Sequence, residues 1–188
     1  EPMPNPRVTG YVSIMRSANR LFDSNFERLL PRVRSKTPES AASPLGRTED
    51  VSYDWLKSGG RRFRPFITLA AYDAATGGSR LKNFESSNHQ FEFSDSVARV
   101  AMSIEAFHKA SLVHDDIEDD DLFRYGRETL HRSEGLGPAI NIGDHLIGLG
   151  YKLIAASRKE LGGDAAGDVL ERMAAAHIKL CDGQGAEM

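Results

Sequence analysis

The stretch HKASLVHDDIEDDD occupies residues 108–121, and six of its last seven residues are acidic. Carboxylates this close together repel one another, so a helix gains no stability from them. The small and apolar residues before them predict a helix whose C-terminal end carries Asp115 and Asp119 one turn apart on one face. Their oxygens suit Mg2+, which takes one or two protein carboxylates and completes its coordination with water and substrate phosphate. Taken alone, an acidic run is more typical of a solvated surface.

The stretch GGRRFRP at residues 59–65 is the second informative feature. Gly59 and Gly60 allow the backbone to approach a ligand closely, and three arginines follow within four residues. Arginine is the residue best suited to bidentate recognition of phosphate. A loop with solvated arginines is the alternative. A basic cluster and an acidic cluster in one chain together predict a phosphorylated substrate that is bound partly through Mg2+.

Helical patterns extend over almost the whole chain, and no strand-type alternation interrupts them. We therefore predict a single all-α domain over residues 1–188. Residues 35–47 are predicted to be a loop, with Thr48 as the N-cap of the next helix, and residues 77–93 form a polar connection. The predicted helices cover residues 8–30, begin at Thr48 and at Pro65, run from Ser94 or Asp95 to the acidic cluster, cover residues 138–161, and begin again at Asp164.

The composition places broad limits on location and partners. The net charge of −3 gives no general case for binding nucleic acid. The single Cys181 excludes an internal disulfide and suits a reducing compartment. No apolar run approaches the ~18 residues that a membrane span requires, and no signal peptide is visible. We therefore expect a cytoplasmic protein with no transmembrane segment.

Five segments carry a resemblance to a known family. In their order and placement they resemble the trans-isoprenyl diphosphate synthases, or polyprenyl synthetases, from about Lys57 onward. The resemblance implies an all-α helical bundle around a central cavity and a homodimer. The family's downstream Lys-Thr pair, Phe-Gln pair and second aspartate-rich motif do not occur, so we expect a truncated, N-terminal portion of such a domain. The matching segments are GGRRFRP at 59–65, HKASLVHDDIED at 108–119, FRYGRETLH at 123–131, INIGDHLIGLGYKLI at 140–154 and HIKLCDGQGAE at 177–187.

The resemblance also implies a reaction and a set of site residues. An allylic prenyl diphosphate ionises with the help of Mg2+, and isopentenyl diphosphate attacks the resulting cation to give a longer trans-prenyl diphosphate. Mg2+ ions and cationic side chains stabilise the departing diphosphate. By this resemblance, Asp115 and Asp119 bind Mg2+, and Asp116 supports those two ligands. Arg124 binds the allylic diphosphate, whereas Arg61, Arg64 and His108 bind isopentenyl diphosphate. Gln184 lies near the reacting chain.

The product length is partly encoded on the helix that precedes the aspartates. Ala110 and Ser111 lie five and four residues before Asp115, where family members that stop at fifteen carbons often carry a bulky aromatic residue. Small side chains there leave a tunnel open, and Phe107 is the next candidate for its floor. We therefore predict a product of about twenty carbons or longer, which Phe in place of Ala110 should shorten.

One departure from the family pattern keeps other functions open. Tyr125 stands where the family usually has a second arginine that serves isopentenyl diphosphate, and Arg127 is the nearby candidate to supply that charge. Tyr125 and the missing downstream motifs favour a non-catalytic or regulatory subunit that binds prenyl diphosphate. A class I terpene cyclase would also use an aspartate-rich Mg2+ site. The GGRRFRP stretch argues against a cyclase, because a cyclase has no second diphosphate to hold.

Overall fold

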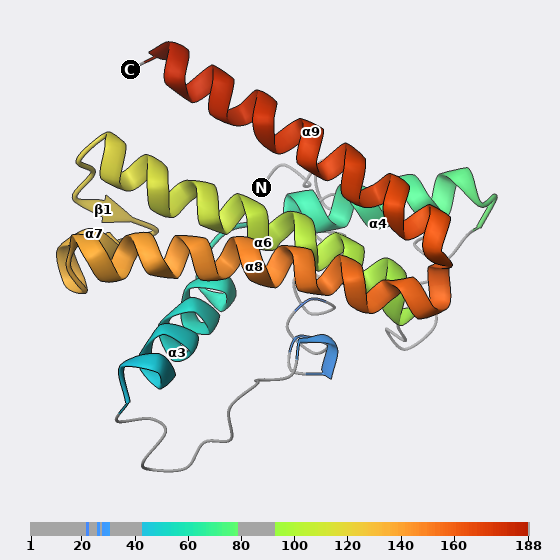
Figure 1. The fold of residues 1–188 in the computed structure, drawn as a ribbon, viewed down its shortest axis with the longest axis horizontal. Coiled ribbons are helices and arrows are strands. Elements are labelled where there is room, and N and C mark those ends of the chain that lie inside the picture. The colour runs from blue at the N-terminus through green and yellow to red at the C-terminus, as the bar shows by residue number, and fades with distance from the viewer. Residues whose placement is uncertain (1–21, 23–25, 27, 31–42, 79–92, 188) are drawn as a thin grey trace, which may run out of the picture.

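The computed structural model describes residues 22, 26, 28–30, 43–78 and 93–187, and in this part the chain is almost entirely helical (Figure 1). The predicted all-α class is confirmed. Two-residue strands between α6 and α7 form a small antiparallel hairpin, which the sequence pattern did not predict. The elements are α3 (Pro44–Lys57), α4 (Phe63–Ala75), α6 (Asp95–Glu118), β1 (Phe123–Arg124), β2 (Arg127–Glu128), α7 (Leu130–Ser133), α8 (Leu136–Leu161) and α9 (Gly163–Glu187).

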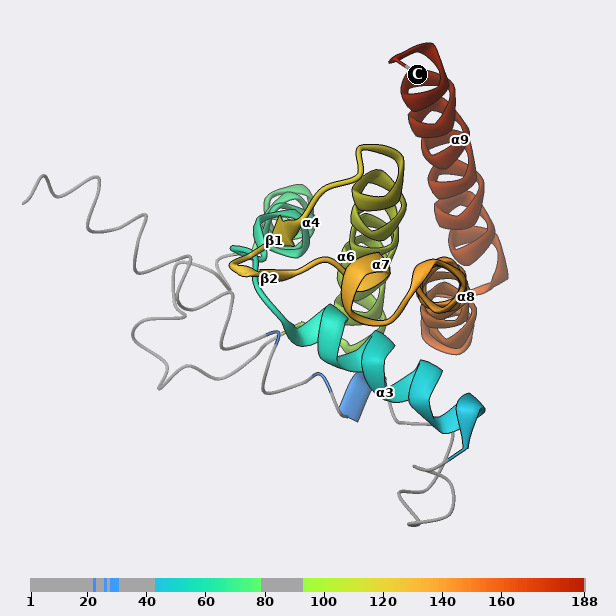
Figure 2. The same ribbon diagram turned by 90° about the vertical axis from the view of Figure 1, so that its left-hand side faces the viewer.

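Helices α6 and α8 form the centre of the fold and make its most extensive contact. They lie side by side in opposite directions, α3 crosses one side of the pair, and α4 packs against α6 (Figures 1 and 2). Helix α9 turns back from the end of α8, so its C-terminus and the acidic end of α6 lie toward the same end of the molecule (Figure 1). Among the described residues, no helix is both long enough and apolar enough to cross a membrane.

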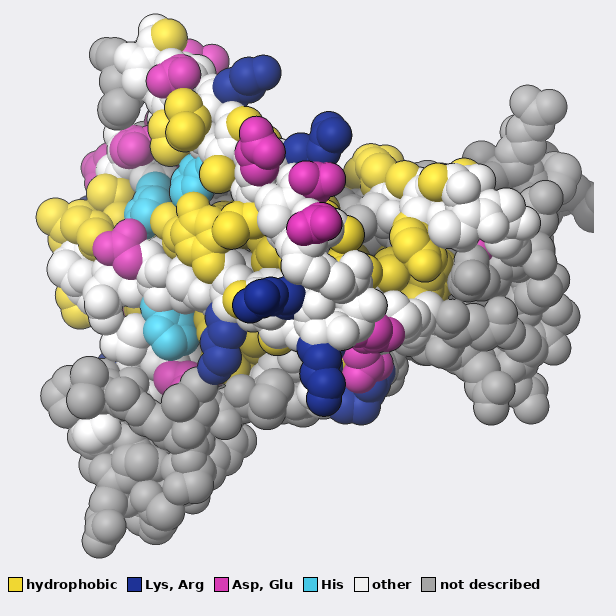
Figure 3. Space-filling view, turned by 45° about the vertical axis from the view of Figure 1, so that its right-hand side comes forward, with side chains coloured by type: hydrophobic (Ala, Val, Ile, Leu, Met, Phe, Trp, Pro, Cys, Tyr) yellow, Lys and Arg dark blue, Asp and Glu magenta, His cyan; other side chains and the backbone are white. Residues whose placement is uncertain are grey.

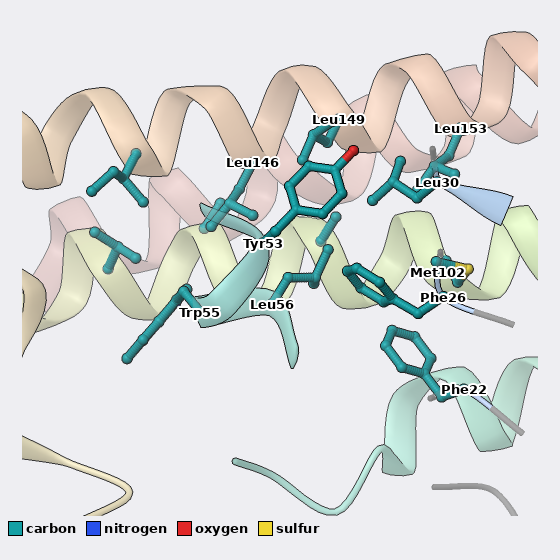
Figure 4. Packing of buried hydrophobic residues seen from close by; sticks show 14 of the residues in the cluster. Phe22, Phe26, Leu30, Tyr53, Trp55, Leu56, Met102, Leu146, Leu149 and Leu153 are labelled. Atoms are coloured by element: carbon teal, nitrogen blue, oxygen red, sulfur yellow. The ribbon is translucent and has the colours of Figure 1, made fainter. Parts of the chain in front are cut away.

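The core lies where α3 meets α6 and α8. Figure 4 shows Tyr53 and Leu56 of α3 packed near Leu146 and Leu149 of α8. Burying each such side chain stabilises the fold by about 1.5–3 kcal/mol. The predicted stripe over residues 8–30 contributes Phe22, Phe26 and Leu29, which are buried in this cluster, while its members Val12 and Met15 lie outside the described residues.

Glycines bring α6 and α8 unusually close together. A Cβ on Gly143 would lie 2.3 Å from Nε2 of His114, and a Cβ on Gly150 would lie 2.7 Å from Cε2 of Phe107. Both distances are shorter than real contacts of a Cβ, so a larger residue at either position would force the facing ring or the helix to move. The glycines of α8 therefore fix how the side chains of α6 are presented to the site.

Several predicted helix ends need correction. The loop predicted over residues 35–47 ends earlier, because Ser43 accepts a hydrogen bond from the Gly46 backbone at 3.1 Å and Pro44 occupies the first turn of α3. Thr48 lies inside α3 and is not its N-cap. Helix α8 begins at Leu136, two residues before Pro138, which the first turn accommodates.

Other predicted ends are close to the observed ones. Ser94 is the N-cap of α6 and accepts from the Val97 backbone at 3.4 Å, as predicted. Helix α4 begins at Phe63 and α9 at Gly163, each within two residues of the predicted start. Most of the polar connection predicted over residues 77–93 lies outside the described residues.

Candidate active site

The exposed side of α6 presents a stripe of predicted site residues. Ile104, His108, Ser111 and Asp115 recur every three or four residues, and all four are half-buried. The opposite side of the helix is buried in the core. One helix face therefore joins the acidic end of α6 to the histidine two turns earlier.

The acidic end of α6 has the oxygen donors that Mg2+ prefers. Asp115 is half-buried, and Asp119 is the exposed C-cap, its backbone N–H bonded to the Asp115 carbonyl at 2.8 Å. Burial raises the pKa of Asp115, and the neighbouring charges of Glu118 and Asp119 raise it further. A divalent cation would relieve this repulsion. The described residues contain no group of three side chains that could hold a metal ion.

Asp116 faces the hairpin instead of the metal candidates. Its carboxylate is 1% exposed and accepts from Nε of Arg124 at 2.7 Å, while Nη2 of Arg124 also bonds Asp121 at 3.0 Å. Burial raises the pKa of Asp116 although Arg124 opposes the shift. The second oxygen of Asp116 has no hydrogen-bond partner among the described residues. Asp116 thus holds Arg124 beside the acidic motif, and its predicted support of the ligands Asp115 and Asp119 stays a prediction.

Arg64 and His108 meet across two helices. An Nη1 of Arg64, on α4, lies 2.9 Å from Nε2 of His108, on α6. Burial lowers the pKa of His108 to about 4, and the charges of Arg64, Lys109 and Arg124 act in the same direction. The ring is therefore neutral at physiological pH, and its Nε2 accepts a hydrogen bond from the guanidinium. Two residues that the family resemblance assigned to one diphosphate are direct neighbours in the fold.

The three arginines of the GGRRFRP stretch do not act alike. Arg61 is exposed, and its role in diphosphate binding stays a prediction. Arg62 turns inward with a left-handed φ of 50°, pairs with buried Glu105 at 2.9 Å and donates to the Lys57 carbonyl. Arg64 reaches the α6 stripe. The basic cluster therefore divides into one structural and two accessible side chains.

One residue of this region, Lys109, was not identified from the sequence. Lys109 is fully buried, donates to the Ser58 carbonyl at 2.5 Å, and lies 4.2 Å from the ring centre of Tyr125. The ring of Tyr125 in turn lies against Gly59, where a Cβ would come within 2.4 Å of Tyr125 Cγ. The only available signal was a lysine immediately after His108 in an otherwise apolar helical segment.

The chain-length residues occupy different surroundings. Phe107 contacts Tyr151 and His177, with ring centres 5.0 Å and 5.6 Å apart, and is half-buried, as is Ser111. Ala110 is 1% exposed and belongs to the core cluster. A tunnel floor at Phe107 suits this geometry, whereas a bulky residue at 110 would first have to displace core side chains.

Gln184 lies near the end of α9 and is half-buried. Among the described residues, its side chain makes no hydrogen bond to the other predicted site residues. Its placement near the reacting chain stays a prediction, supported only by the direction of α9 toward the acidic end of α6 (Figure 1).

Known proteins with similar sequences are named as synthases of prenyl diphosphates. A sequence model of the family described as polyprenyl synthetase matches residues 47–188. Geranylgeranyl pyrophosphate synthase of Geoglobus acetivorans is 30% identical over 138 residues, which are 71% of this chain and 37% of that protein. Geranylfarnesyl diphosphate synthase of Aeropyrum pernix is 33% identical over 143 residues, covering 76% of this chain and 41% of that protein.

A solved structure agrees with these sequences. The crystal structure of geranylgeranyl pyrophosphate synthetase from Pyrococcus horikoshii Ot3 matches with a TM-score of 0.69 at 27% identity, over 94% of this chain and 46% of that one. The chain thus spans less than half the length of these relatives.

Proposed function

Because the chain belongs to the polyprenyl synthetase family, we propose that the protein is a Mg2+-dependent prenyltransferase that joins an allylic prenyl diphosphate to isopentenyl diphosphate. One observation carries this proposal. Two cationic positions lie along the exposed side of α6, Arg124 at its acidic end and the Arg64–His108 pair two turns earlier. Asp116, which holds Arg124, and His108 are eight residues apart on α6, a rise of about 12 Å. Two separate anion sites suit two diphosphate substrates.

The reaction assigns a task to each position. The C–O bond of the allylic diphosphate breaks, the double bond of isopentenyl diphosphate attacks the allylic carbon, and a proton leaves the new chain to the departing diphosphate. Arg124, oriented by Asp116, holds the departing diphosphate, and Arg64 and His108 hold the second one. Mg2+, held by Asp115 and Asp119, would supply further stabilisation of the negative charge that develops.

The proposal extends to product and assembly. Relatives named for geranylgeranyl and geranylfarnesyl products, together with Phe107 as the tunnel floor, support a product of about twenty carbons or longer. We also propose a homodimer in the cytoplasm.

A turnover assay on the full natural protein tests the function. Radiolabelled isopentenyl diphosphate is supplied with dimethylallyl, geranyl or farnesyl diphosphate, in Mg2+ or in EDTA. We expect extended prenyl diphosphates only with Mg2+, and a loss of at least about 100-fold in rate for Asp115→Asn. Asp120→Asn is the matched control, because Asp120 is exposed and pairs with Arg132 at 2.5 Å.

Tyr125 favours a second candidate, a non-catalytic subunit that binds prenyl diphosphate. This candidate predicts saturable binding of the allylic diphosphate with no extension under any condition. Release of a cyclic hydrocarbon from the allylic diphosphate alone would instead indicate a terpene cyclase. Either result contradicts the transferase proposal.

A further inference from the structure

Lys109 is a buried cation that forms no ion pair with a carboxylate of its own among the described residues. Its side chain is fully buried, and its Nζ contacts the Ser58 carbonyl at 2.5 Å and the rings of Tyr125 and Trp55 at 4.2 Å and 5.3 Å from their centres. The nearest carboxylate, Glu105, is engaged by Arg62 at 2.9 Å. Two cations and one carboxylate are thus buried together. Such an excess of positive charge disfavours folding, so it suggests a role in binding an anion.

The ammonium of Lys109 lies next to the loop formed by Gly59 and Gly60, here called the glycine loop. A Cβ on Gly60 would lie 3.9 Å from Nζ of Lys109 and 3.5 Å from the hydroxyl of Tyr125. Both Gly59 and Gly60 have left-handed φ angles, of 61° and 80°. The loop therefore lies against the ring of Tyr125, and because Gly60 has no side chain, its backbone lies close to the ammonium. Arg64 lies four residues after Gly60, and His108 immediately precedes Lys109 on α6, so an anion on this loop would also lie near the Arg64–His108 pair.

We propose that Lys109 and Tyr125 together form the floor of the isopentenyl diphosphate pocket, in which the buried ammonium of Lys109 supplies the positive charge that the phenol of Tyr125 lacks. This inference rests on the proposed transferase function. The ring of Tyr125 stacks on the ammonium as a cation–π partner, and its hydroxyl faces the loop as a hydrogen-bond donor. Tyr125 alone would leave this position without the positive charge that an arginine supplies. The ammonium of Lys109 restores that charge.

The protonation states suit these roles. Burial lowers the pKa of Lys109 to about 8, so roughly nine-tenths of the side chains remain charged at pH 7. Burial raises the pKa of Tyr125, so its hydroxyl keeps the proton that it would donate.

Arg127 is the competing source of charge. It is exposed, and its Nη1 donates to the Ser58 hydroxyl at 3.1 Å, on the same residue whose carbonyl holds Lys109. Because Arg127 and Lys109 flank one loop residue, the same substitution at each gives a matched comparison.

Steady-state kinetics of the full natural protein separate the two. We expect Lys109→Met to raise the KM for isopentenyl diphosphate about tenfold or more, as loss of a charge-assisted contact does, with the KM for the allylic substrate within about twofold. Arg127→Met should change either KM less than about threefold. Tyr125→Arg in the Lys109→Met background should restore most of the lost affinity. Provided that the wild type turns over, two results overturn the inference. One is a larger rise in the KM for isopentenyl diphosphate from Arg127→Met than from Lys109→Met, and the other is an unchanged KM in Lys109→Met.

A binding measurement that does not depend on turnover uses Trp55, the single tryptophan of the chain. Its indole donates to the Lys109 carbonyl at 3.0 Å, so its fluorescence reports on Lys109. Inorganic pyrophosphate should change this fluorescence saturably in the wild type, and much less in Lys109→Met. If the wild type does not turn over, only the proposed function is refuted. If pyrophosphate does not change the fluorescence of Trp55 in the wild type, the role of Lys109 is refuted. If Lys109→Met does not fold, which circular dichroism would show, the wild-type titration decides.

Discussion

Asp115 is placed where its negative charge disfavours the folded, metal-free protein. Burial and two neighbouring carboxylates raise its pKa above the unfolded value. The folded state then binds more protons than the unfolded state just above pH 4, so this group's contribution to stability falls as the pH rises through that window. At neutral pH the charged carboxylate of Asp115 lowers the stability of the folded protein. Such a destabilising charge is typical of a residue that binds a ligand.

We expect Asp115→Asn to stabilise the metal-free protein and to remove its response to metal. Relief of repulsion from Glu118 and Asp119, three and four residues away, is worth about 0.5–1 kcal/mol, or a rise in Tm of about 1–4 °C. Thermal unfolding followed by circular dichroism measures this. Mg2+ with pyrophosphate should raise the Tm of the wild type and of Asp120→Asn, but not of Asp115→Asn. A lower Tm for metal-free Asp115→Asn would contradict this account.

His108 predicts a loss of stability in mild acid. Its pKa of about 4 lies below the unfolded value near 6.5. The unfolded state therefore takes up the proton first, and stability is lost as the pH falls from 6.5 toward 4. After a discount for the exposed part of the ring, the effect at pH 5 is on the order of 1 kcal/mol.

The variant His108→Gln should remove that part of the acid sensitivity. The fall in Tm between pH 7 and pH 5 should be smaller than in the wild type by about 2–4 °C. His177→Gln, on α9, controls for the loss of a histidine elsewhere. Equal falls in wild type and His108→Gln would show that the ring is not held neutral by the fold.

Helical periodicity was sufficient to predict the long helices. Local chemistry alone was insufficient to predict some of the residues at which they begin. Ser43 and Thr48 are both good N-caps, and Pro44 at the first helical position decides for Ser43. Arg64 and His108 could be assigned by resemblance to the family. The inward turn of Arg62 could not, because its left-handed backbone is held by Glu105, 43 residues away. Nor could Lys109, whose partners come from two separate segments of the chain, at residues 55–58 and at Tyr125.

The contact between α6 and α8 predicts a distinct behaviour for two glycines on one helix. Gly150→Ala would place a Cβ 2.7 Å from the ring of Phe107, so the ring or the helix must move, at a cost of about 1–3 kcal/mol. Gly148→Ala meets nothing within 4 Å and should stabilise α8 by up to about 1 kcal/mol.

Urea unfolding and product chromatography would test this pair. We expect Gly150→Ala to unfold at lower urea and to change the product lengths, because Phe107 is the proposed tunnel floor. Gly148→Ala should unfold at the same or higher urea with unchanged products. A destabilised Gly150→Ala with unchanged products would separate Phe107 from control of chain length.

The outer surface of α8 and α9 retains large apolar side chains. Leu136 and Ile140 of α8 are 56% and 43% exposed, and Ile178 and Leu180 of α9 are 63% and 66% exposed. Figure 3 shows hydrophobic side chains gathered in a band across one face of the molecule, between acidic and basic groups. Exposed apolar side chains gathered on one face are typical of contact sites between proteins.

We therefore predict that the 188-residue chain associates with itself and that α9 takes part. Sedimentation velocity should give a mass above the 20.7 kDa of one chain, and the double substitution Ile178→Glu and Leu180→Glu should shift it toward the monomer, because association would then bury two carboxylates without partners. Lys179→Glu, between them on the same exposed stretch, changes the charge without removing apolar surface and should leave the mass unchanged. If the double variant and Lys179→Glu lower the mass equally, net charge and not apolar contact controls association. If the wild type is already monomeric, α9 is not a self-association surface in this chain.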